Sequence, residues 1–396
     1  MNEKQINQQN AGGLTDNTYT IQILISESNF KFKSNVHGFT GVIDWGDGNR
    51  PAYYMSNDKP EHEYEKPGTY TVTHTGKCDR LDYYDENESA ACLTDIIHIG
   101  ADMDIHKVDY AFVDCKRLAF LREDLFAKHL PLNGLLMTFC GCTSLKEIPE
   151  GLFAHSKTIW DFILTFSGCT SLTEIPEKLF YNCPQVTSFL GTFSGCSSLR
   201  AIPEKLFEQN KLSKSFDQTF ELCISLTEIP GGLFRSCTLS DSFNYTFHGC
   251  SALQSVPETL FHNNTMASSF ICTFYGCKSL ARIPKVLFQT CNRAEIFYGT
   301  FRQCASLRTI PADLFDFCTR ISCLAETFSG CEKLTGESPY SVINGKKVHL
   351  YERKGHPAHF AVAPADIRSC FDSCYGLSDY GLMPAAYKQP IKNDER

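Results

Sequence analysis

Cysteine and histidine are the residue types in this sequence whose spacing could serve chemistry directly. The chain has 20 cysteines and 12 histidines among 396 residues. Three pairs have a spacing that a metal ion could use: Cys140 with Cys142, Cys370 with Cys374, and His356 with His359. A zinc site needs a second pair at a matching spacing, and none accompanies these pairs in the sequence. We therefore expect no metal site and no cofactor, and we place the two histidines in a loop of the C-terminal cap.

The sequence also lacks the common signatures of catalysis. It has no serine nucleophile elbow, no glycine-rich phosphate loop and no H-E-x-x-H motif. Most serines and cysteines recur at fixed intervals instead, which indicates a structural role. We expect a protein that is not an enzyme.

Most of the cysteines belong to a repeat of 27 residues. The cysteine of a C-x-x-L element recurs without insertion or deletion at Cys115, Cys142, Cys169, Cys196, Cys223, Cys250, Cys277, Cys304 and Cys331. In most copies an isoleucine or valine follows, and then a proline. The other half of each copy holds a Thr-Phe pair and a second column: Ser156, Cys183, Asn210, Cys237, Asn264, Cys291 and Cys318. A fixed period of this length predicts a solenoid.

One such unit cannot bury its Leu, Ile and Phe side chains alone, so successive units should stack at the spacing of hydrogen-bonded strands, about 4.8 Å. The sequence predicts a mainly β solenoid of about nine coils. The cysteine and asparagine columns fit inward ladders that bond backbone groups. Disulfides between neighbouring ladder cysteines are the alternative, although a continuous column gives each thiol two equivalent partners. We expect the parallel sheet on the C-x-S-L-x-x-I-P side of each coil.

The segment before the repeats has the pattern of a small antiparallel sandwich. Apolar and polar residues alternate in Tyr19–Ile25 and again in Thr69–Thr73. We expect a flexible N-terminus over 1–17 and the sandwich over 18–78. An irregular first coil over 79–111, around Ile96–Ile99, should then cap the solenoid.

This segment resembles the PKD-like (polycystic kidney disease) domain family. The shared pattern is a W-G-D-G turn followed by H-x-Y-x-x-x-G-x-Y-x-V, carried by Trp45, Gly46, Asp47, Gly48, His62, Tyr64, Gly68, Tyr70 and Val72. The resemblance implies an immunoglobulin-like spacer or binding module of an extracellular protein. We expect Asp47 to cap its turn, with a calcium ligand as the alternative.

The repeats over 112–334 resemble BspA-like leucine-rich repeats, the TpLRR type of bacterial surface proteins. The stretch TFSGCTSLTEIPEKLF matches the F-x-x-C-x-x-L-x-x-I pattern of that family. The resemblance implies adhesion or ligand binding. A PKD-like segment ahead of such repeats is also similar to prophage-encoded proteins. The period of 27 residues is longer than the family usually shows.

After Leu334 the period breaks. The next matching unit, Phe371-x-x-Cys374-x-x-Leu377, follows an insertion in which Asn344-Gly345 between apolar flanks predicts a hairpin. We expect 335–396 to form a C-terminal cap with this hairpin and a last repeat.

Charge and hydropathy narrow the class of partner. The formal net charge of −8 argues against a non-specific nucleic-acid binder. The sequence has no long apolar run, so we expect no membrane insertion. The first residues are polar and show no secretory signal. The resemblances nevertheless imply an extracellular, cell-surface or virion-associated protein.

Ligand specificity requires columns that vary between copies, because packing dictates the ladder positions. Three variable columns lie around the Phe-x-x-Thr-Phe segment. They supply six candidate ligand-binding residues: Trp160, Lys214, Asp217, Asn244, Tyr245 and Tyr298. Their mixed polar and aromatic character suits recognition of a protein or glycan. The alternative is a solvent-exposed face whose residues vary between copies without a role in binding.

Two functions remain. The first is a non-catalytic binding or adhesion protein that recognises a protein or glycan on a host or envelope surface. The alternative is a structural component of a phage tail or other extracellular particle. In that case the solenoid is a rigid spacer, and a defined oligomer is expected.

Overall fold

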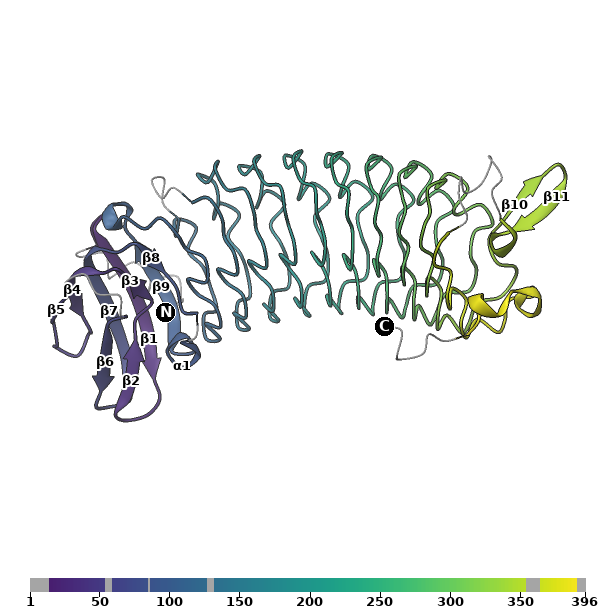
Figure 1. Cartoon of the computed structure of the whole chain (residues 1–396). Helices are drawn as coiled ribbons and strands as arrows, with labels where there is room; N and C mark the ends of the chain where they lie inside the picture. Colours follow the sequence, from purple (N-terminus) through teal and green to yellow (C-terminus); the bar gives the residue numbers. More distant parts are fainter. Residues whose placement is uncertain (1–13, 54–58, 85, 127–131, 354–363, 390–396) are drawn as a thin grey trace, which may run out of the picture.

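The computed structural model describes residues 14–53, 59–84, 86–126, 132–353 and 364–389. A β-sandwich occupies one end of an elongated molecule, a row of stacked coils follows, and a hairpin projects at the far end (Figure 1). Among the described residues, no helix is long and apolar enough to cross a membrane.

The sandwich is built from antiparallel strands. Its five-stranded sheet has the order β5-β4-β7-β1-β9, formed by β5 (Ala52–Tyr53), β4 (Thr40–Asp44), β7 (Gly68–Lys77), β1 (Thr18–Ile25) and β9 (Leu93–Ile99). Two short pairs accompany it: β2 (Phe30–Lys33) with β6 (Glu61–Tyr64), and β3 (Val36–His37) with β8 (Arg80–Leu81). The short α1 (Asn87–Ala90) and the 3₁₀ turn η2 (Ala101–Met103) flank β9.

Trp45 lies at the centre of the sandwich core and is fully buried. The Tyr64 hydroxyl donates to the Trp45 carbonyl at 2.9 Å, and the His62 ring stacks on the indole at 5.1 Å. Asp47 accepts the Asn49 amide at 3.0 Å and contacts His62 Nε2 at 2.7 Å. The predicted turn-capping role of Asp47 is therefore confirmed.

The segment around Ile96–Ile99 differs from the prediction of an irregular first coil. It forms β9, which pairs antiparallel with β1 from Tyr19↔Ile99 to Ile23↔Leu93. An open edge of β1 would leave a row of backbone donors and acceptors unpaired, and β9 satisfies them. Coil-to-coil pairing starts at β8, where Arg80 forms a parallel bridge with Lys107.

Successive coils are joined along one face by single-residue parallel bridges. The bridged column, called the ladder face here, runs Gly134, Asp161, Ser188, Ser215, Ser242, Ser269, Ile296, Cys323 and Asp366. The sequence predicted the sheet on the other side, where the described residues form only the bridges Arg282–Thr309 and Gly336–Leu377. The proline column on that side removes a backbone donor from each layer, which limits pairing there.

Inside the coils, repeated side chains form ladders between layers. The hydroxyl of Thr165 donates to the Leu135 carbonyl at 2.8 Å, and the thiol of Cys169 donates to the Phe139 carbonyl at 3.3 Å. Asn210 Nδ2 donates to the Cys183 carbonyl at 2.8 Å. The predicted inward role of these columns is confirmed. Stacked phenylalanine rings, 5.4 to 6.3 Å apart between layers, fill the remaining core.

The C-terminal end closes the stack. Asn344 and Gly345, both at positive φ, join β10 (Tyr340–Ile343) to β11 (Lys346–His349). The turns η3 (Leu350–Glu352), η4 (Tyr380–Leu382) and η5 (Ala385–Tyr387) follow. Phe371 stacks on Phe328 at 5.4 Å, so the last unit continues the core. His356 and His359 lie outside the described residues.

Candidate ligand-binding surface

Each coil turns twice through the left-handed backbone region. Between the two turns the Thr-Phe pair is buried, and the residue after this pair is partly exposed in most layers. The first turn column, with φ between 51° and 60°, holds Met137, Leu164, Gly191, Gln218, Tyr245, Cys272, Gly299 and Glu326. The second turn column, with φ between 55° and 75°, holds Gly141, Gly168, Gly195, Leu222, Gly249, Gly276, Gln303 and Gly330. The first column is one of the variable columns found in the sequence.

Between the two turns lies a column that the sequence reasoning missed. It directly follows the Thr-Phe pair, or Cys370-Phe371 in the last unit, and reads Cys140, Ser167, Ser194, Glu221, His248, Tyr275, Arg302, Ser329 and Asp372. Its variation between copies was the available signal. Together with residues of the neighbouring columns, its central part forms what we call the outer ribbon: Glu221, Tyr245, His248, Tyr275, Tyr298, Arg302 and Glu326.

The outer ribbon is a continuous chain of contacts across five layers. Glu221 Oε1 contacts His248 Nδ1 at 2.8 Å. The His248 ring stacks on Tyr275 at 4.8 Å, and the Arg302 guanidinium lies over Tyr275 at 5.4 Å. Arg302 in turn forms an ion pair with Glu326. The ribbon residues therefore hold one another in defined positions.

Glu326 is the buried end of the outer ribbon, with 3 % of its surface exposed. The Tyr298 hydroxyl donates to Glu326 Oε2 at 3.0 Å. Burial, together with the nearby Glu326 carboxylate, raises the pKa of Tyr298 to about 12, so its hydroxyl remains a hydrogen-bond donor at neutral pH. Arg302 compensates the buried negative charge.

The structure brings two of the six predicted residues, Tyr245 and Tyr298, into the outer ribbon. Tyr245 packs edge-to-face against His248 at 5.7 Å. Lys214 is exposed on the ladder face. Trp160 is also exposed, but it lies nearer the N-terminal end of the solenoid beside a pocket.

The other two predicted residues, Asp217 and Asn244, bond neighbouring layers. Asp217 Oδ1 accepts from Ser242 Oγ at 2.6 Å and from the Asn244 amide at 2.8 Å. Asn244 Oδ1 accepts from Ser269 Oγ at 2.6 Å in the same way. Burial raises the pKa of Asp217, and the hydrogen bond from Ser242 opposes that shift. Both side chains thus accept hydrogen bonds from the next layer and hold adjacent layers together.

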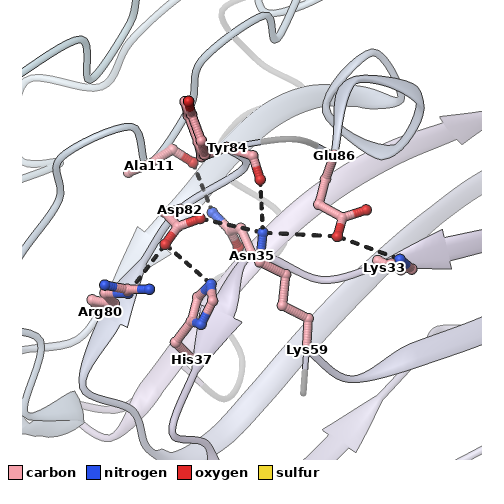
Figure 2. A network of polar contacts seen from close by, with 9 residues as sticks. All are labelled: Lys33, Asn35, His37, Lys59, Arg80, Asp82, Tyr84, Glu86 and Ala111. Carbon is pink, nitrogen blue, oxygen red and sulfur yellow. Dashed lines mark hydrogen bonds and ion pairs between the residues drawn. The ribbon is translucent and has the colours of Figure 1, made fainter. Parts of the chain in front are cut away.

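A second polar cluster lies where the sandwich meets the first coil (Figure 2). Asp82 contacts His37 at 3.1 Å, Lys59 at 3.2 Å and Arg80 at 3.1 Å. Asn35 Nδ2 donates to the Ala111 carbonyl at 3.0 Å, which links the sandwich to the solenoid. Burial lowers the pKa of His37, and the Asp82 charge partly offsets this. The cluster therefore ties the two parts together.

Within the described residues, no group of three or more His, Cys, Asp or Glu side chains is placed to hold a metal ion. The ladder thiols donate to backbone carbonyls. Burial raises the pKa of thiols such as Cys223 well above the usual value, which disfavours the nucleophilic thiolate.

The repeat geometry defines a β-rich solenoid of the leucine-rich-repeat type, because leucine and phenylalanine columns are buried layer upon layer and parallel bridges join successive layers. No protein-family model matches the chain, and a search of curated proteins also found no match. Among solved structures, the chain is similar to a leucine-rich cell surface protein from Faecalibacterium prausnitzii. The identity is 17 %, the coverage is 74 % of this chain and 80 % of the other, and the TM-score is 0.29.

Two further solved structures were found. One is the Toll–Spatzle complex of Drosophila, with 14 % identity, coverage of 71 % of this chain and 37 % of the other, and a TM-score of 0.24. The other is the leucine-rich repeat domain of the type III effector XopL, with 15 % identity, coverage of 56 % and 64 %, and a TM-score of 0.20. These TM-scores are low, so the assignment of the solenoid rests on its own repeat geometry.

Proposed function

We propose that this protein is a non-catalytic binding or adhesion protein that recognises a protein or glycan ligand through the outer ribbon. In this proposal the solenoid consists of about nine coils of the BspA-like type, and the sandwich is a PKD-like module that carries it. The location proposed is extracellular or at a cell or virion surface.

One observation carries the proposal. The core columns repeat the same residue types in layer after layer, whereas the column after Thr-Phe changes from Glu221 to His248, Tyr275 and Arg302. Glu221 Oε1 lies 2.8 Å from His248 Nδ1, and the ring centroids of His248 and Tyr275 are 4.8 Å apart. The Arg302 guanidinium lies 5.4 Å from the centroid of the Tyr275 ring. Aromatic and arginine side chains held in position lose little entropy on binding, and such residues dominate binding energy at interfaces.

The test is a screen of the full chain against arrays of surface proteins and glycans, followed by matched variants. Tyr245→Gly removes a ribbon side chain at a left-handed position where Gly191 and Gly299 already occur, so the fold should tolerate it. Tyr275→Ala removes the centre of the ribbon. Each change should weaken binding about tenfold or more, which corresponds to about 1.4 kcal/mol.

Tyr181→Ala is the control, because Tyr181 is 50 % exposed and takes no part in the outer ribbon. It should leave binding unchanged. If the two ribbon variants bind as tightly as the parent chain, the outer ribbon is not the binding surface.

The alternative of a structural spacer is supported by the polar cluster around Asp82, which joins the sandwich to the first coil. A spacer should assemble into a defined oligomer. Light scattering of the full chain across a concentration series measures this. A fixed oligomer, combined with no ligand in the screen, would favour the spacer.

A further inference from the structure

A pocket of about 580 Å³ lies on the ladder face near the sandwich. Three consecutive layers build it from equivalent coil positions. Its lining includes His106, Lys107 and Asp109 of the first layer, Asn133 and Gly134 of the second, and Trp160 and Asp161 of the third. The pocket therefore follows the stacking direction of the solenoid and lies outside the outer ribbon.

Gly134 explains why the ladder face is hollow at this layer. The following layers place Asp161, Ser188 and Ser215 in the same column, whereas Gly134 has no side chain. A Cβ atom at Gly134 would lie 3.1 Å from Asp161 Oδ2. The Asp161 carboxylate therefore lies against the position that a side chain at Gly134 would take, and the glycine leaves it uncovered on that side.

Trp160 forms an apolar wall of this pocket. It is 55 % exposed, whereas the other tryptophan, Trp45, is fully buried. A large aromatic surface left in water beside a concave site is a common feature of binding sites. The indole face is a platform for the apolar C–H face of a ligand ring.

The polar groups of the pocket include both hydrogen-bond donors and acceptors. Asp161 is 5 % exposed, and its Oδ1 accepts the Ile163 amide at 3.4 Å. Asp109 Oδ1 accepts the Leu136 amide at 3.1 Å. Lys107 adds a positive charge and Asn133 adds an amide, which both donates and accepts.

Charges of both signs line this pocket, so neither an anion nor a cation is matched by the whole lining. An anion would meet the carboxylates of Asp109 and Asp161, and a cation would meet Lys107. A neutral polyhydroxylated ring can use all of these groups, because each hydroxyl both donates and accepts.

We infer that this pocket binds a pyranose unit of a neutral glycan. The sugar ring stacks on Trp160, while Asp161, Asp109, Asn133 and Lys107 bond its hydroxyls. The inference rests on the proposed function in taking the solenoid as a ligand-binding surface, but it concerns a site separate from the outer ribbon.

The experiment titrates the full chain with a panel of neutral hexose and N-acetylhexosamine oligosaccharides and follows tryptophan fluorescence with iodide as quencher. Because Trp45 is buried, iodide quenching reports on Trp160. A bound sugar should protect Trp160 in a saturable manner. Failure of every sugar in the panel to protect Trp160 would overturn the inference.

Two variants test the geometry by calorimetry. Gly134→Ser fills the pocket floor with the residue found at Ser188 in the same column. Its Cβ would lie 3.1 Å from Asp161 Oδ2, so the Asp161 side chain must shift slightly, and urea unfolding of the variant checks that the fold is kept. Asp161→Asn keeps the size of the side chain and removes its charge. Each should weaken sugar binding about tenfold or more, and Gly134→Ser binding with unchanged affinity would refute the pocket.

Control variants separate this inference from the proposed function. Tyr275→Ala, in the outer ribbon, should leave sugar binding intact. If the ribbon ligand binds normally while no sugar protects Trp160, the inference fails and the proposed function stands. If sugars bind but the ribbon variants change nothing in the array screen, the proposed function of the ribbon fails. Protection of Trp160 by a lysine-rich or an acidic peptide, in place of neutral sugars, would assign the pocket to a charged ligand and overturn the inference.

Discussion

The second turn column allows a quantitative test of the free-energy cost of its left-handed backbone. Gly195 has φ +73°, and a Cβ atom there would lie 3.5 Å from Gly168 Cα, which is ordinary contact. Gly195→Ala therefore adds no clash and isolates the cost of the left-handed backbone, about 1–2 kcal/mol. Alanine recovers about 0.4–1 kcal/mol through the unfolded chain. The net destabilisation should be about 1 kcal/mol.

The neighbouring layer provides the reverse change. Leu222 occupies the same column at φ +56° and is 46 % exposed. Leu222→Gly relieves the left-handed strain but loses chain entropy and some burial, so it should be neutral or stabilising by up to about 1 kcal/mol. Urea unfolding midpoints of the two variants and the parent chain measure both effects.

Gly381→Ala is the control for this pair, because Gly381 has open space around it and no positive φ. It should be neutral or slightly stabilising. If Gly195→Ala and Gly381→Ala shift the midpoint equally, left-handed strain does not explain why glycine dominates the second turn column.

Three further outcomes are expected. Because burial raises the pKa of Asp217, the folded state binds its proton more tightly than the unfolded chain does, and the charged form destabilises the fold above that pKa. Asp217→Asn should therefore raise the urea unfolding midpoint at neutral pH. The difference from the parent chain should shrink as the pH falls through the pKa of Asp217 in the folded state. A difference that does not depend on pH would contradict this. Arg302→Ala leaves Glu326 buried without its ion-pair partner and should cost about 3 kcal/mol in urea unfolding, with partial recovery in the double variant that adds Glu326→Gln. In the native protein, a thiol reagent such as DTNB should label at most the half-buried Cys140 and Cys323. After denaturation it should label all 20 cysteines. Rapid labelling of a ladder cysteine in the native protein would show that the core opens.

The sequence was sufficient to predict the stacked coils and their ladders. Cys169 and Cys196 occupy the same position in adjacent layers, and each donates to the equivalent carbonyl of the preceding layer. Because adjacent layers have similar sequences, the contacts between one pair of layers recur in the next pair. The turn carried by Asp47 was also predictable, because a carboxylate after Trp-Gly satisfies nearby backbone locally.

The side of the coil that carries the ladder was not predictable from the period. Both sides repeat with the same 27-residue interval, and backbone pairing depends on which side brings amides and carbonyls opposite each other. The partner of Ile96–Ile99 was similarly hidden, because β1 and β9 are far apart in the chain and either a coil or a strand edge could bury the same residues.

The sequence by itself determined that this protein is a stack of 27-residue layers, since repetition and hydrophobic burial are properties of each unit. Only the tertiary structure decided which variable residues meet. In the folded chain, Asp217 and Asn244 hydrogen-bond adjacent layers, and Tyr275 contacts both His248 and Arg302. A pocket also lies at Gly134 beside Trp160. The physical reason is that a side chain in a solenoid has its nearest partners one layer away, at a distance set by packing and not by sequence neighbours.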